Sequence, residues 1–111
     1  MKKIIFPTND GINVEEHFGH CKKFAVCLIE NEEIVSVNLI QAPEHQPGLL
    51  PKFLGKQGAN VIITGGMGQR AINLFKEQGI DVILGSEGKI EDVLHKYLNS
   101  NLVSKGSGCQ H

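Results

Sequence analysis

The second half of the chain alternates between short, mainly apolar runs and segments with helical periodicity. The apolar runs are residues 60–64 and 80–84, and helical spacing of apolar residues marks 69–78 and 89–99. A strand that is apolar on both faces is buried between two layers, and strand–helix–strand units join parallel strands by right-handed crossovers. This half therefore predicts a parallel sheet with helices packed against it.

The first half has a different pattern, in which two strand-like runs are separated by only two residues. Residues 23–30 and 33–41 flank Asn31-Glu32, which predicts a β-hairpin. Strict alternation in the second run places Val35, Val37 and Leu39 on one apolar face and Ile34, Ser36, Asn38 and Ile40 on the other.

A further strand over residues 3–7 and a helix over 49–57, ended by Gly58, complete the expected order of elements. The order predicts an α/β fold with three layers in the order αβα, in which the middle layer is a five-stranded mixed sheet.

Composition limits the functions that such a domain can have. The chain has 111 residues, enough for one domain, and its 11 basic and 12 acidic residues give a net charge of −1. There is no basic excess to neutralise phosphates, and aromatic residues make up only 5% of the chain. We therefore expect no nucleic-acid partner.

The cysteines and the apolar runs indicate a cytoplasmic protein. Three cysteines do not suit a disulfide framework, no apolar run is long enough to span a bilayer, and the run Ile4–Phe6 is too short for a secretory signal. We expect reduced thiols and no membrane partner. Cys27, between Val26 and Leu28, is expected to be a buried core thiol.

The segment from His17 to Cys21 has the strongest metal-binding character. It supplies His17, His20 and Cys21 within a long Gly-bearing loop over residues 8–22. Imidazole and thiolate are ligands that iron, copper, zinc and metal sulfides prefer. The spacing does not match a closed zinc site, so the pattern favours an open, exchangeable site over the alternative of a polar loop with an incidental cysteine.

Other candidate ligands stand in two further segments. His45 lies in the loop over residues 42–48, where on its own it is a surface histidine. Cys109 and His111 end a Gly/Ser-rich tail over 104–111, which is expected to be mobile. The tail is interpreted equally well as a metal-capping arm or as a disordered end with a reactive thiol.

A glycine-rich turn, Gly65-Gly66-Met67-Gly68, joins an expected strand to an expected helix that carries Arg70. Backbone N–H groups at a helix N-terminus attract anions, which favours an anion cradle made by Gly65, Gly66, Gly68 and Arg70. The glycines could instead serve only a tight turn. A nucleotide site also remains open, because Gly66-x-Gly68-x-x-Ala71 followed by Glu87 fits a dinucleotide fingerprint.

No nucleophile elbow or Walker A motif is present, so we expect a binding protein and not an enzyme. A redox sensor that uses Cys21 and Cys109 is a third alternative.

Four motifs together resemble the dinitrogenase iron–molybdenum cofactor biosynthesis family, which includes NifX-like carriers and the C-terminal domain of NifB. They are Pro-Thr-Asn-Asp-Gly at 7–11, His-Phe-Gly at 17–19 with Phe24, Glu-His-x-Pro-Gly-x-Leu-Pro at 44–51, and Gly-Gly-Met-Gly-x-Arg-Ala at 65–71. The resemblance extends from about residue 3 to residue 103, so we expect one domain over 1–103 and a separate tail. It is nearest to the short, stand-alone archaeal and bacterial branch, although Cys21 departs from the nitrogenase carriers.

The resemblance implies a ribonuclease-H-like fold and binding of iron–sulfur or molybdenum-containing clusters, with His17 as the cluster-binding histidine. It also implies a P-loop ATPase of the iron–sulfur carrier type as a partner. The expected function is binding, carriage or scaffolding of an anionic metal–sulfur cluster or its precursor, with His17 and Cys21 as ligands and His20 and His45 as helpers. The alternative is a small nucleotide-binding regulatory domain that uses Gly66–Ala71.

Overall fold

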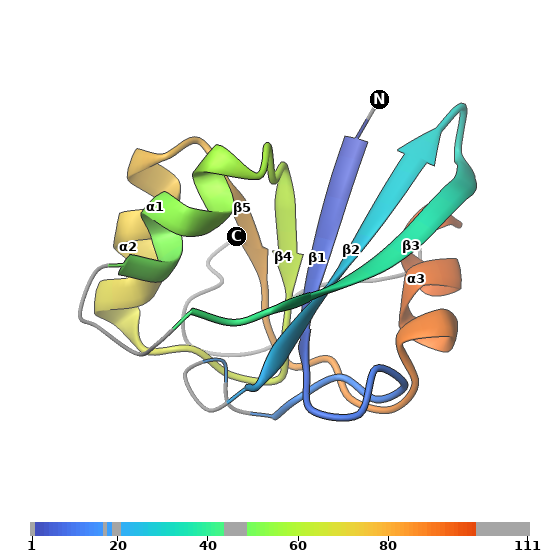
Figure 1. Cartoon of the computed structure of the whole chain (residues 1–111), viewed down its shortest axis with the longest axis horizontal. Helices are drawn as coiled ribbons and strands as arrows, with labels where there is room; N and C mark the ends of the chain where they lie inside the picture. The colour runs from blue at the N-terminus through green and yellow to red at the C-terminus, as the bar shows by residue number, and fades with distance from the viewer. Residues whose placement is uncertain (1, 17, 19–20, 44–48, 100–111) are drawn as a thin grey trace.

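Five strands and three helices form the computed structural model, which describes residues 2–16, 18, 21–43 and 49–99 (Figure 1). In chain order the elements are β1 (Lys2–Thr8), β2 (Lys23–Glu30), β3 (Glu33–Gln41), α1 (Leu49–Lys56), β4 (Val61–Ile63), α2 (Gln69–Glu77), β5 (Asp81–Ile83) and α3 (Ile90–Leu98). The expected elements are all present, and their ends differ from the expected ones by one residue or so.

All five strands belong to one mixed sheet in the order β3-β2-β1-β4-β5. The pairs β1–β2 and β2–β3 are antiparallel, whereas β1–β4 and β4–β5 are parallel. The predicted α/β fold with a five-stranded mixed sheet is thereby confirmed. In this order β1 and β4 are central, which agrees with the apolar sequence of both strands.

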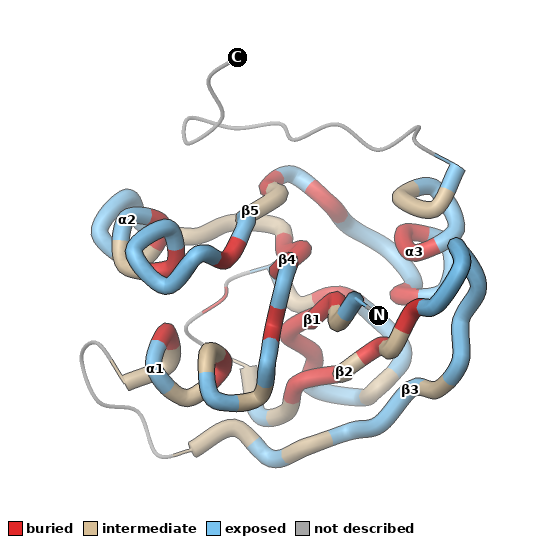
Figure 2. The backbone as a smooth tube through the Cα atoms, turned by 90° about the horizontal axis from the view of Figure 1, so that it is seen from above, coloured by how far each residue is buried: buried red, intermediate tan, exposed pale blue. Residues whose placement is uncertain are grey.

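Helices cover both faces of the sheet, as the three-layer prediction requires (Figure 1). Ile90, Val93 and Leu94 of α3 pack with the face of the sheet that carries Ile4, Phe6, Ala25, Cys27 and Ile63. On the opposite face, Leu54 of α1 and Phe75 of α2 pack with Ile5, Phe24 and Ile62. Red segments in Figure 2 mark this buried centre of the molecule.

The turn residues explain where the elements end. Asn31 and Glu32 have φ angles of 54° and 63°, the left-handed pair that closes a two-residue hairpin with the correct twist. Gly58 follows α1 with φ 82°, a conformation that favours glycine after a helix and ends α1 as predicted.

The face assignment within β3 was wrong for one residue. A β-bulge shifts the register between Leu28 and Ile29, so that Ser36 pairs with Leu28 and Ile34 pairs with Ile29. A bulge inserts one extra residue and interrupts strict alternation. Ile34 therefore joins Val37 on the α3 face of the sheet, and simple alternation could not have shown this.

The strand directions bring four loops to one edge of the sheet. The carboxyl ends of β1, β4 and β5 meet there because these strands are parallel. The start of β2 and the end of β3 reach the same edge, since Thr8 pairs with Lys23 and Lys23 pairs with Gln41. Ligands of open α/β sheets commonly bind beyond the carboxyl ends of the strands. None of the helices in the described ranges is long and apolar enough to cross a membrane.

Candidate functional site

The described part of the loop between β1 and β2 is bonded to the end of β1, to the turn after β4 and to the segment just before α3. The Glu15 amide donates to the Pro7 carbonyl at 2.7 Å, and the Val14 amide donates to the Gly88 carbonyl at 2.8 Å. The Gly65 amide donates to the Glu15 carbonyl at 3.4 Å. The loop that was singled out for its length is thus a bonded cover over the ends of β1, β4 and β5.

A turn built around Asp10 holds the first part of this loop. Its carboxylate accepts hydrogen bonds from the amides of Ile12 and Asn13, both at 2.8 Å, and from the Asn13 side chain. These bonds stabilise the charged form and hold the pKa of Asp10 well below its usual range. The buried Thr8 hydroxyl donates to the Asn13 carbonyl at 2.6 Å and closes the turn.

Phe18 fixes the second part of the loop, and sequence reasoning missed this role. Its side chain is 4% exposed, and its ring meets Phe75 edge-on with 5.3 Å between the ring centroids. A second contact joins it to Phe24 at 5.8 Å, and its amide donates to the Gly66 carbonyl at 3.1 Å. The available signal was an aromatic residue between a histidine and a glycine in a largely polar loop.

Cys21 lies at the carboxyl end of β1, half-buried against the core beneath α1 and α2. The Thr8 backbone N–H hydrogen-bonds its sulfur. Phe18 and Met67, from the glycine-rich turn, belong to the same apolar cluster. Burial and the nearby Glu15 carboxylate raise the pKa of the Cys21 thiol to about 11, outweighing the stabilising backbone N–H groups. A redox-sensing cysteine needs a lowered pKa, so the raised pKa of Cys21 disfavours that alternative for this residue.

The glycines of the turn between β4 and α2 differ in how much space a side chain would have at each position. A Cβ on Gly65 would lie 2.8 Å from the Glu16 carbonyl oxygen and 2.9 Å from its Cα. A Cβ on Gly66 would lie 3.3 Å from the same oxygen, and a Cβ on Gly68 would meet nothing within 4 Å. None of these three has a positive φ. A glycine is therefore required at position 65 because the loop approaches it closely. The backbone conformation of the turn by itself does not require glycine at any of the three positions.

The N-terminus of α2 is open toward this edge. Its N-cap, Gly68, provides no side-chain cap, and the first turn has no acidic residue. By contrast, the first turn of α3 carries Glu91 and Asp92, which offset the helix dipole. Arg70, the second residue of α2, is exposed and forms no ion pair with any residue in the described ranges. An anion placed there would meet the N–H groups at the start of α2 and one guanidinium.

A buried hydroxyl in the loop between β5 and α3 also went unnoticed in the sequence. Ser86 is 5% exposed, and its Oγ has no hydrogen-bond partner among the described residues. Its amide donates to the Thr64 carbonyl at 3.2 Å. Ser86 is thus bonded to the residue that directly precedes the glycine-rich turn.

The structure describes only part of the predicted site. Cys21, Gly65, Gly66, Gly68 and Arg70 gather at the same edge of the sheet, and Cys27 is fully buried in the core as expected. The remaining predicted ligands, His17, His20, His45, Cys109 and His111, lie outside the described residues, as does the 104–111 tail. The start of the His45 loop is placed, because the Ala42 amide donates to the Lys22 carbonyl at 2.9 Å. Across the described ranges no three His, Cys, Asp or Glu side chains are grouped to hold a metal ion.

Comparison with known proteins gives concordant matches over nearly the whole chain. The uncharacterized protein MJ0580 of Methanocaldococcus jannaschii is 31% identical over 107 residues, which cover 92% of this chain and 90% of that protein. The crystal structure of PH0822 is 35% identical and superposes with a TM-score of 0.86, covering 90% and 91% of the two chains.

The apo form of the orange protein from Desulfovibrio gigas has the same fold, with a TM-score of 0.78 at 22% identity and coverage of 95% and 93%. The model of the family described as dinitrogenase iron-molybdenum cofactor matches residues 1–100. The chain therefore belongs to the dinitrogenase iron-molybdenum cofactor family.

Proposed function

We propose that the protein binds and carries an anionic metal–sulfur cluster, or its precursor, at the edge where β1, β4 and β5 end. The observation that carries the proposal is the position of Cys21 at the end of β1, next to the strand that leads into the uncapped N-terminus of α2. A soft ligand and an anion-attracting helix end thus lie at one edge of the sheet.

The thiol of Cys21 would supply the bond to the metal. At neutral pH the apo protein holds it protonated, because its pKa is raised to about 11. Binding must therefore release a proton, so affinity should rise with pH. A thiol that stays protonated until a metal arrives resists oxidation in the empty carrier, which suits a protein that repeatedly loads and unloads.

The N-terminus of α2 would hold the negative charge of the cluster sulfides. Lys22 and Lys23 stand at the same edge as Arg70 and add positive charge, although Glu15 and Glu16 partly offset it. Because Gly68 has open space where a Cβ would be, a large anion can approach the backbone closely.

The finer assignments rest on the sequence and on the family. We propose His17 as the second ligand beside Cys21, with His20 and His45 as helpers and Cys109 and His111 as ligands from the 104–111 tail. The carrier domain would be residues 1–103. Iron–sulfur or molybdenum-containing clusters are the proposed cargo, a P-loop ATPase of the iron–sulfur carrier type is the proposed partner, and the cytoplasm is the proposed location. The protein would act by binding and not by catalysis.

Nothing in the comparisons supports the nucleotide-binding alternative. The glycine turn leads into a nine-residue helix, and the sheet order β3-β2-β1-β4-β5 contains antiparallel strands where a second mononucleotide unit would stand.

The proposal is tested by anaerobic titration with tetrathiomolybdate, followed by its visible absorption and by molybdenum analysis after desalting. We expect stoichiometric binding that weakens about tenfold as the pH falls from 8 to 7, a range above the usual pKa of histidine ligands, since one thiol proton is released. Cys21→Ser should abolish this pH dependence. Binding that is unchanged in Cys21→Ser would refute the assignment of the thiol.

A matched pair of variants tests whether the N-terminus of α2 binds the anion. Arg70→Gln and Lys76→Gln remove the same charge from the first and last turns of α2. Only Arg70→Gln should weaken thiomolybdate binding, and added salt should reduce the difference between the two variants. Equal effects of the two substitutions would show that the N-terminus of α2 does not contact the anion.

A further inference from the structure

An apolar surface remains exposed on β3, whose Val37 and Leu39 lie on the α3 face of the sheet, the face opposite the apolar cluster that includes Cys21. The outer strand β3 presents Ile34, Val35, Val37 and Leu39, which are between 38% and 53% exposed. Ile12, from the loop after β1, is 57% exposed and lies beside them. Large exposed apolar patches on a small protein usually mark an interaction site.

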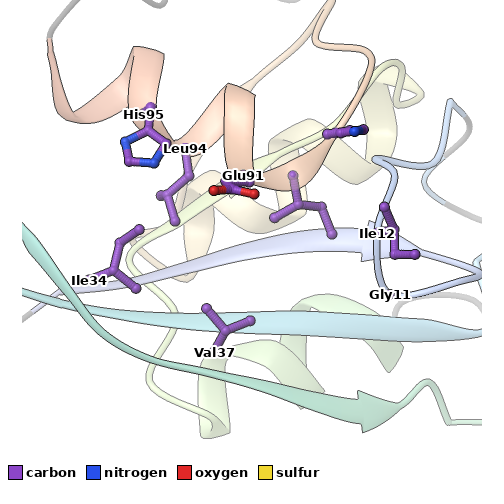
Figure 3. A pocket seen from close by; sticks show the side chains of 9 residues that line it. Gly11, Ile12, Ile34, Val37, Glu91, Leu94 and His95 are labelled. Atoms are coloured by element: carbon purple, nitrogen blue, oxygen red, sulfur yellow. The ribbon is translucent and has the colours of Figure 1, made fainter.

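This surface borders a groove between β3 and α3 (Figure 3). Ile34 and Val37 line it from the strand, and Leu94 and His95 line it from the helix, around a volume of about 380 Å³. The groove lies on the α3 face of the sheet, where the β-bulge lets Ile34 join Val37. Cys21 belongs to the apolar cluster beneath α1 and α2, so the groove and Cys21 lie on opposite faces of the sheet, although both reach the same loop edge.

The backbone of β3 is also open to a further strand. In the part of the chain that the structure describes, β3 pairs with β2 and with no other strand. Natural edge strands are usually protected by Lys, Pro or short length. β3 has nine residues, with no Pro, no Lys and no charge after Glu33. A β-bulge is its one protective feature, and it affects only the end near Ile34.

The charges around β3 select an antiparallel partner of the same sequence. Glu30, Glu32 and Glu33 cluster at the hairpin end, whereas Lys22 and Lys23 lie at the other end, where Lys23 pairs with Gln41. An antiparallel copy of β3 would place the acidic end of each copy beside the basic end of the other. A parallel arrangement would bring the three glutamates of each copy together.

We propose that this face is a homodimer interface, in which β3 of two copies pair antiparallel and join the two sheets into one of ten strands. Pairing centred on Val37 sets Val37 opposite its own counterpart, and Leu39 of each copy lies next to Val35, the bulge residue, of the other. The second copy thus covers the apolar side chains that β3 leaves exposed, while Cys21 stays with the apolar cluster on the other face of the sheet.

Sedimentation velocity from 5 to 500 µM on the full chain tests the proposal. Wild type should form a dimer, and Val37→Lys should raise the dissociation constant at least about tenfold, because it sets like charges opposite each other on an edge strand. Val37 is half exposed, so this variant should keep its fold, as circular dichroism would verify.

Charge reversal provides the control. Glu32→Lys with Glu33→Lys should weaken the dimer, Lys22→Glu with Lys23→Glu should also weaken it, and all four together should restore it. A wild type that is monomeric at 500 µM, or a dimer unaffected by Val37→Lys, would overturn the proposal. A failed rescue would overturn the antiparallel arrangement. A dimer that forms only after residues 100–111 are removed would show that this segment, and not a second copy, covers the face.

Discussion

The close approach of the β1–β2 loop to Gly65 predicts a sharp difference between two glycine substitutions in the same turn. In Gly65→Ala the new methyl would lie 2.8 Å from the Glu16 carbonyl oxygen, about 0.6 Å inside an ordinary contact. The obstacle is backbone, so it cannot move as a flexible side chain would. Relief requires displacement of the segment that also bonds Glu15 to Gly65 and Phe18 to Gly66.

The magnitude follows from two opposing effects. Overpacking a close contact typically costs about 1–3 kcal/mol, whereas replacing glycine by alanine stabilises by about 0.4–1 kcal/mol through the unfolded state. Gly65→Ala should therefore lower the free energy of unfolding by about 1–2 kcal/mol. In Gly68→Ala the new Cβ has free space, and a φ of −68° suits alanine. Only a slightly poorer helix cap then opposes the stabilisation that comes from the unfolded state. Its change should stay within about 0.5 kcal/mol.

Urea unfolding followed by circular dichroism measures both values under identical conditions. For a domain of this size the Gly65→Ala loss corresponds to a fall in Tm of about 5–10 °C. If the two variants differ by less than about 0.5 kcal/mol, the loop does not press on Gly65 as described, and the argument that the loop is a fixed cover fails.

Three further predictions concern single residues of the loop. Cys21 should react with iodoacetamide about tenfold more slowly at pH 8 in the folded protein than in urea. The raised pKa lowers the fraction of thiolate more than it raises the nucleophilicity of that thiolate. A pH profile of the rate with its midpoint below pH 9 would contradict this prediction. Asp10→Asn should speed hydrogen exchange at the Ile12 and Asn13 amides, which donate to the Asp10 carboxylate. In wild type these amides should stay protected from exchange as the pH falls through 4, since a depressed pKa keeps the carboxylate charged. Loss of protection near pH 4 would refute the depressed pKa. Phe18→Ala should cost about 3–5 kcal/mol of stability, measured by urea unfolding, and an effect below 1 kcal/mol would show that the ring is not a packed anchor.

Most of the fold was predictable because local and long-range signals agree in this chain. Apolar runs such as Val61–Ile63 could only be buried strands, and Gly58 marked the end of α1. The bulge near Ile34 was not predictable, since it depends on pairing with β2 and not on the sequence of β3 alone. The exposure of Val35 and Val37 was likewise hidden, because alternation identifies an apolar face but not what covers it.

The candidate site was predictable only as a set of chemical groups. Cys21 and the glycine-rich turn stood out by residue type, and the order of the strands brings them to one edge. The anchoring role of Phe18 and the separate need for a glycine at position 65 depend on contacts between segments more than 40 residues apart in sequence. Such contacts leave no local pattern, so only the folded structure shows them.

The central claim is that Cys21 binds a metal–sulfur cargo. Its most direct test is elemental analysis for Fe, Mo, Cu and Zn on protein purified anaerobically from its native host, comparing wild type with Cys21→Ala and Cys27→Ala. Both substitutions remove one thiol, but Cys27 is enclosed in the core. The account predicts metal together with acid-labile sulfide in wild type and in folded Cys27→Ala, and its loss in Cys21→Ala. Equal metal content in the two variants, or none in wild type even after incubation with thiomolybdate or an iron–sulfur cluster, would contradict it.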